Sequence, residues 1–167
     1  MTSYNKLIIF IVALVLFSVA VVFLANTDNN SANKLMPDIS SDIAEGDSQY
    51  NEAVDLLNNK SYDEAKNKAI SAGNNFNHTY IQLSSIRDNF TSETKDVHKN
   101  YINTLLNEVE LKINATEYLI DSIDKFKSYQ NATGNDYASK ANEHMQDAVE
   151  FQNVRNNLTN NNPNLFK

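Results

Sequence analysis

The sequence predicts an all-α protein, in which an N-terminal transmembrane helix precedes an extracytoplasmic antiparallel bundle of three long helices and one short helix. Residues 7–25 contain no charged side chain, and as a helix they would extend about 28 Å, close to the ~30 Å hydrocarbon core of a bilayer. Beyond residue 41, apolar residues recur three and four positions apart, which is the period of one helix face. Only three glycines and two prolines occur in 167 residues, which argues against a turn-rich β protein.

The apolar run at 7–25 indicates an uncleaved membrane anchor. It is longer than the core of a secretory signal, and Phe23 suits a signal-peptide cleavage site poorly. A cleaved signal peptide is the alternative. Lys6 precedes the run and no basic residue follows it until Lys34, so the positive-inside rule leaves residues 1–6 in the cytoplasm. We therefore expect a single-pass protein of the cell membrane, in contact with lipid through the run and with its C-terminal domain outside.

Residues 26–41 are polar, include Pro37 and show no apolar period, so they are interpreted as a linker. A bundle domain is expected over 42–158. Its first helix, at about 42–58, is short and has an apolar face of Ile43, Tyr50, Val54 and Leu57.

The second helix is expected to begin at a capping box, in which Ser61 and Glu64 satisfy each other's free amides. Its apolar face keeps its phase across Gly73, which favours one bent helix over two helices broken at that glycine. This face consists of Tyr62, Ala65, Ala69, Ala72, Phe76, Tyr80, Leu83, Ile86 and Phe90.

The third helix, expected over 93–129, has the strongest pattern and spans about 55 Å. Its apolar face consists of Tyr101, Ile102, Leu105, Val109, Ile113, Thr116, Leu119, Ile120, Ile123 and Phe126. Residues 131–135 have loop composition, and Asp136 would cap the last helix. The last helix has an apolar face of Tyr137, Ala141, Met145, Ala148, Phe151 and Leu158, and residues 159–167 are expected to form a disordered tail. Short loops between long helices predict antiparallel packing, as in a bundle or coiled coil.

Composition narrows the function classes. The chain has 21 acidic and 14 basic residues, a net charge of −7, so phosphate backbones are repelled and nucleic acid is not an expected partner. Cysteine is absent, which excludes disulfides and thiolate metal sites. With 27 asparagines and 12 lysines to two arginines, the composition is typical of an AT-rich genome.

The polar residues form no recognisable reactive constellation. His78, His98 and His144 lie on different predicted segments and are expected at the surface. The carboxylate pairs Glu108 with Glu110 and Asp121 with Asp124 fall between apolar positions and are expected to be solvated. No catalytic, cofactor-binding or metal-binding residue is predicted, and we expect a protein that is not an enzyme.

Seven Asn-x-Ser/Thr sequons occur, at Asn29, Asn59, Asn77, Asn89, Asn114, Asn131 and Asn157. An asparagine-rich composition alone would produce about four. Asn59 and Asn131 lie in predicted loops and are the preferred glycosylation candidates.

Residues 50–72 resemble one helical hairpin of the tetratricopeptide family, because that family's small and apolar positions are matched here by Ala53, Leu56, Ala65, Ala69 and Ala72. The resemblance implies a tight α-hairpin there. The layout as a whole, an anchor followed by an asparagine-rich acidic helical exterior without cysteine, resembles uncharacterised single-pass surface proteins of AT-rich methanogenic archaea. Neither resemblance supplies functional residues.

Two functions fit these observations. The favoured one is a structural or protein-interaction role, with exposed helix faces that bind another envelope protein or a second copy of the chain. The alternative is an extracytoplasmic ligand-sensing or binding module that acts through a membrane partner.

Overall fold

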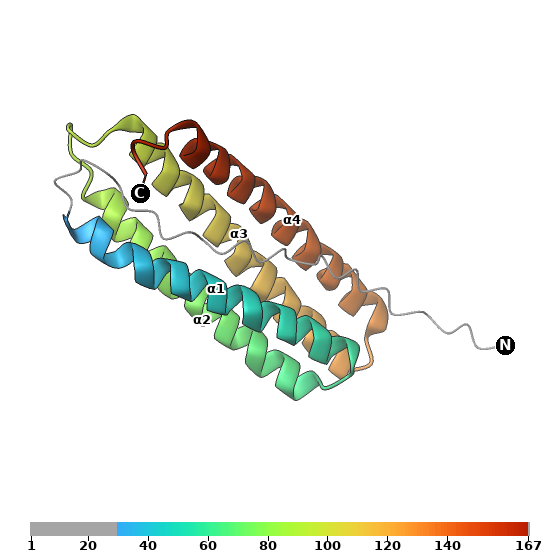
Figure 1. Cartoon of the computed structure of the whole chain (residues 1–167). Helices are drawn as coiled ribbons and strands as arrows, with labels where there is room; N and C mark the ends of the chain where they lie inside the picture. Colours follow the sequence, from blue (N-terminus) through green and yellow to red (C-terminus); the bar gives the residue numbers. More distant parts are fainter. Residues whose placement is uncertain (1–29, 167) are drawn as a thin grey trace.

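The computed structural model describes residues 30–166, with side chains from residue 32 onward. Four antiparallel helices follow one another: α1 (Asn30–Asn58), α2 (Tyr62–Asp88), α3 (Asp96–Lys127) and α4 (Asn131–Asn161) (Figure 1). The described part is helical and contains no β-strand, which confirms the predicted all-α bundle. The helices have 29, 27, 32 and 31 residues, so the bundle has four long helices instead of three long and one short.

Packing follows the order of the chain. α1 packs on α2, α2 on α3 and α3 on α4, and α1 also touches α3, while α1 and α4 make no close backbone contact within the described range. The predicted apolar faces form the core, with Phe76, Leu83, Tyr101, Ile102 and Leu105 among its most buried side chains. The aromatic and long residues at the edges of these faces, such as Tyr80 and Ile113, are half-buried against this core.

The linker prediction for 26–41 is wrong from Asn30 onward, because α1 begins there and continues through Pro37. Ala32, Met36, Ile39 and Ile43 continue the spacing of four and three, and each is at most 1% exposed. Burial of a Met or Ile side chain contributes about 1.5–3 kcal/mol, which offsets the backbone hydrogen bond that proline removes.

α2 is continuous through Gly73, so the favoured single helix is confirmed over the glycine. Ser61 is its N-cap residue, but the Ser61 side chain makes no capping hydrogen bond, and the predicted capping box does not form. The turn is instead held from the α1 side, where the N–H of Lys60 donates to Leu57 O at 2.9 Å and that of Ser61 to Leu56 O at 2.9 Å. This pattern, with Lys60 at a φ of 62°, is a Schellman motif.

The α3–α4 turn repeats that motif. The N–H of Tyr129 donates to Phe126 O at 3.0 Å and that of Gln130 to Lys125 O at 2.9 Å, and the φ of Tyr129 is 60°. The expected loop over 131–135 is the first turns of α4. Gly134 packs so closely on Phe126 that an added Cβ would lie 3.0 Å from that ring, so the glycine serves helix packing here and does not mark a loop.

The prediction of a disordered tail over 159–167 is wrong for the described residues. α4 continues to Asn161, and Phe166 then folds back to be only 8% exposed, with its ring centre 5.5 Å from that of His98 and 5.2 Å from that of Tyr101.

None of the described helices is long and apolar enough to cross a membrane. The predicted cytoplasmic stub at 1–6 and anchor at 7–25 lie outside the described residues.

Candidate functional site

Four charged side chains lie inside the bundle, and they are its most unusual chemical feature. Asp47 of α1, Glu108 and Lys112 of α3 and Arg155 of α4 are each at most 7% exposed. Buried charges are rare unless they are paired, so the pairing of these four decides what the cluster can do.

Each charge occupies a position in a seven-residue repeat that, apart from Gln152, otherwise carries apolar or small residues. Such inward positions alternate at spacings of four and three along each helix. They are Met36, Ser40, Ile43, Asp47, Tyr50, Val54 and Leu57 on α1, Tyr101, Leu105, Glu108, Lys112, Ala115, Leu119, Ser122 and Phe126 on α3, and Gly134, Ala138, Ala141, Met145, Ala148, Gln152 and Arg155 on α4.

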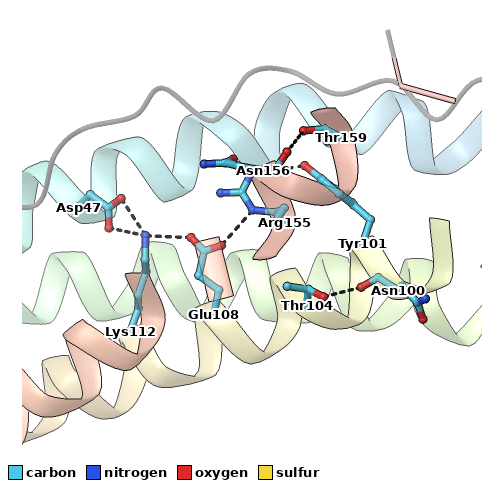
Figure 2. A network of polar contacts seen from close by, with 9 residues as sticks. All are labelled: Asp47, Asn100, Tyr101, Thr104, Glu108, Lys112, Arg155, Asn156 and Thr159. Atoms are coloured by element: carbon cyan, nitrogen blue, oxygen red, sulfur yellow. Dashed lines mark hydrogen bonds and ion pairs between the residues drawn. The ribbon is translucent and has the colours of Figure 1, made fainter. Parts of the chain in front are cut away.

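Lys112 stands at the centre of the cluster. Its Nζ donates to both carboxylate oxygens of Asp47, at 2.8 Å each, and lies 3.3 Å from Glu108 Oε1, an ion-pair distance without hydrogen-bond geometry (Figure 2). The same Nζ lies 5.7 Å from the centre of the Phe76 ring of α2, within cation–π range. One ammonium group therefore contacts side chains of α1, α2 and α3.

Arg155 extends the cluster to α4. Its Nε donates to Glu108 Oε2 at 3.0 Å, its Nη1 lies 3.5 Å from the Tyr101 hydroxyl, and its guanidinium carbon lies 5.9 Å from the centre of the Tyr101 ring. Figure 2 shows Asp47, Lys112, Glu108 and Arg155 in one line that crosses from α1 through α3 to α4. The line alternates in sign and sums to zero.

Burial controls the electrostatics of the cluster. Burial raises the pKa of the Asp47 carboxyl above its ordinary value, and the neighbouring Lys112 ammonium partly reverses that shift. Burial likewise raises the pKa of Tyr101, against the opposing effect of Arg155. The hydroxyl of Tyr101 therefore stays protonated and acts as a neutral neighbour of the guanidinium.

The arrangement is suited to fixing helix register, because each charged group has an opposite charge on a neighbouring position as its partner. Within the cluster, the buried atoms Arg155 Nη2 and Glu108 Oε1 have no hydrogen-bond partner among the described residues, although Glu108 Oε1 lies 3.3 Å from the Lys112 ammonium. No described cavity is lined by the four charged residues. A polar group at an inward heptad position specifies which layers of neighbouring helices align.

The expectation that Glu108 is solvated is wrong, because that carboxylate is 0% exposed. The other three carboxylates of the predicted pairs are more accessible: Glu110 and Asp121 are exposed, and Asp124 is half-exposed. Asp124 forms an ion pair with Lys66 at 2.7 Å. A charged side chain normally marks the solvated face of a helix, and this rule fails for Glu108. The unbroken seven-residue spacing from Tyr101 to Phe126 is the signal that identifies its position.

The expectation of surface histidines is also wrong for His98, which is 0% exposed. Its Nε2–H donates to the carbonyl oxygen of Leu165 at 3.0 Å, so it holds the C-terminal tail. His78 is exposed and pairs with Asp42 at 2.7 Å. His144 is half-buried and stacks on Tyr118, with ring centres 5.2 Å apart.

No group of three or more histidine, aspartate or glutamate side chains between residues 30 and 166 is placed to hold a metal ion. The glycosylation candidates Asn59 and Asn131 are both exposed and flank the two turns at the same end of the bundle. Their modification stays a prediction.

Comparison of the chain with protein-family models, curated proteins and solved structures finds no match. The resemblances noted from the sequence therefore stay predictions.

Proposed function

We propose that this chain is a single-pass membrane protein in which residues 7–25 anchor an extracytoplasmic helical bundle with a non-catalytic structural or protein-interaction role. The uncharged apolar run supports the anchor. The mutual pairing of the buried charges supports a fixed scaffold, because Asp47, Lys112, Glu108 and Arg155 each already contact an opposite charge.

The outer face of α2 carries the interaction part of the proposal. Ile70 is 42% exposed and Ile81 is 67% exposed. Eleven residues are just over three helical turns, so both side chains lie on one face, with exposed Asn74 and Asn77 between them. We infer that a second copy of the chain or another envelope protein packs on this face.

A photo-crosslinking amino acid in place of Ile81 tests this face in native membranes. We expect a discrete crosslinked product larger than the monomer. The same substitution at Glu117, which is exposed on α3, is the matched control and should give monomer only. Monomer at both positions would contradict the interaction role.

Alkaline carbonate extraction of membranes tests the anchor separately. The full-length chain should stay with the lipid pellet and keep its original N-terminus. Release into the supernatant, with an N-terminus beginning after residue 25, would support the cleaved-signal alternative.

A second candidate function, ligand sensing through a membrane partner, is favoured by one groove. A hollow of about 480 Å³ lies between α1 and α2, and its lining includes Gln49, Leu56 and Asn67. Its volume falls within the ~300–1,000 Å³ of small-molecule sites. A metabolite that raises the melting temperature of the wild type but not of an Asn67→Trp variant, which fills the groove, would support this function.

A further inference from the structure

The two ends of the bundle differ. The tail end consists of residues 30–35 at the start of α1, residues 87–99 around the loop between α2 and α3, and the C-terminal residues 159–166. The turn end consists of the two Schellman turns at 59–61 and 128–130 (Figure 1). The contact between His98 and Leu165 places the tail against the start of α3.

The short connection between the predicted anchor and α1 keeps the tail end close to the lipid. If the anchor ends at Ala25, only four residues separate it from Asn30, where α1 begins. A fully extended chain covers about 3.5 Å per residue, so this connection reaches less than about 20 Å. α1 alone is about 44 Å long, and the turn end therefore lies beyond the reach of the connection.

The distribution of charge distinguishes a bundle that stands upright on the membrane from a bundle that lies on its side. The tail end, taken as residues 30–35, 87–99 and 159–166, carries four basic and three acidic side chains. The remainder of the described bundle, residues 36–86 and 100–158, carries eight basic and 17 acidic side chains. Anionic lipid headgroups repel the acidic sides of the bundle. The nearly neutral tail end is therefore the surface that can lie close to the headgroups.

We propose that the bundle stands end-on on the bilayer, with its tail end against the lipid headgroups and its turn end outermost. This inference rests on the anchor of the proposed function and adds the surface that meets the lipid. It also places the exposed Tyr129, Asn59 and Asn131 at the far tip, more than about 40 Å from the headgroups.

Energy transfer from single labelled positions to the lipid surface tests the orientation. The chain contains no cysteine, so Ser92→Cys, Asn107→Cys and Ser128→Cys each introduce one labelling site, at the tail end, the middle of α3 and the turn end. All three positions are exposed. The full-length variants are reconstituted in vesicles of phosphatidylcholine and phosphatidylglycerol that carry a headgroup acceptor, and a melting temperature equal to that of the wild type selects folded variants.

We expect transfer to fall in the order Ser92→Cys, Asn107→Cys, Ser128→Cys. Equal transfer from the three sites in chains that float with the vesicles would overturn the end-on orientation and leave the anchor intact, and so would the reverse order. Chains that do not float with the vesicles would overturn the anchor itself, and with it the proposed function.

Discussion

At the scale of single residues, the bundle tolerates four buried charges because each one meets an opposite charge. Removal of an unpaired ion from water costs several kcal/mol, and a close partner with hydrogen bonds can offset that cost. The alternation of Asp47, Lys112, Glu108 and Arg155 meets this condition across three helices. We therefore interpret the cluster as a determinant of register, with little net contribution to the free energy of unfolding.

Loss of one member should cost more than loss of a pair. Arg155→Met removes the hydrogen-bonded partner of Glu108, which is 0% exposed, and should lower the free energy of unfolding by about 3 kcal/mol. The double variant Glu108→Gln, Arg155→Met should recover part of that loss in chemical denaturation. Full additivity of the two single losses would show that the pair is not coupled.

His98 should make the stability depend on pH. Burial lowers the pKa of His98, and the Lys95 ammonium acts in the same direction, against the hydrogen bond to Leu165 O. A histidine whose pKa is lowered on folding stabilises the fold above its unfolded pKa of about 6.5, and this contribution is lost as the pH falls below that value.

The melting temperature should accordingly fall as the pH drops from 7 toward 5. In His98→Gln, whose amide can still donate to Leu165 O, the decrease should be smaller. Deletion of residues 165–167 exposes the ring and should reduce the pH dependence in the same way. An identical slope in all three proteins would assign the effect to other groups.

At the scale of elements, periodic apolar positions predict where each helix lies. The predicted helix boundaries are wrong where a single Pro or Gly residue suggests a loop. The faces from Tyr62 to Ile86 and from Tyr101 to Phe126 pack into the core as predicted, although Tyr62, Tyr80, Ile113 and Ile120 at their edges are half-buried. Pro37 and Gly134, which resemble loop signals, lie within helices because the surrounding side chains are buried against neighbouring helices. Such tertiary contacts are not visible in local composition.

Two helical glycines should respond to alanine in opposite ways. A Cβ on Gly46 would lie 2.5 Å from the fully buried Phe76 ring, whereas a Cβ on Gly73 would meet its nearest neighbour, a methyl group of Thr116, at 3.4 Å. Gly73→Ala should raise the free energy of unfolding by about 0.5–1 kcal/mol through helix propensity. Gly46→Ala should lower it by about 1–2 kcal/mol through overpacking.

Both glycine variants can be measured by urea denaturation under one set of conditions. Equal effects of the two substitutions would show that α1 and α2 do not approach each other as closely at Gly46 as the structure has them.

Tyr129 should be replaceable with a gain in stability. It holds a left-handed conformation that favours glycine, and its side chain is 92% exposed, so Tyr129→Gly relieves strain at little loss of burial. We expect a gain of about 1 kcal/mol in the free energy of unfolding. Ser128→Gly is the control, because Ser128 has a φ of −90° and gains nothing. A loss of stability in Tyr129→Gly would indicate that the ring makes a stabilising contact.

At the scale of the whole molecule, the sequence predicts the all-α class, the antiparallel order and most of the core. The charged cluster and the docked tail depend on contacts between residues far apart in the chain. Glu108 and Arg155 are 47 positions apart, and His98 and Leu165 are 67 apart. Both groups of contacts hold α3 and α4 in fixed alignment, which suits a scaffold that presents its surfaces in a constant geometry.

The central claim is that residues 7–25 hold this bundle on the outer side of a membrane, and chemical labelling of intact cells tests it most directly. The Ser128→Cys variant supplies the only thiol in the chain, at the exposed turn end. A membrane-impermeant maleimide should label it as fully in intact cells as after lysis. Labelling that appears only after lysis would place the bundle inside the cell and contradict the account.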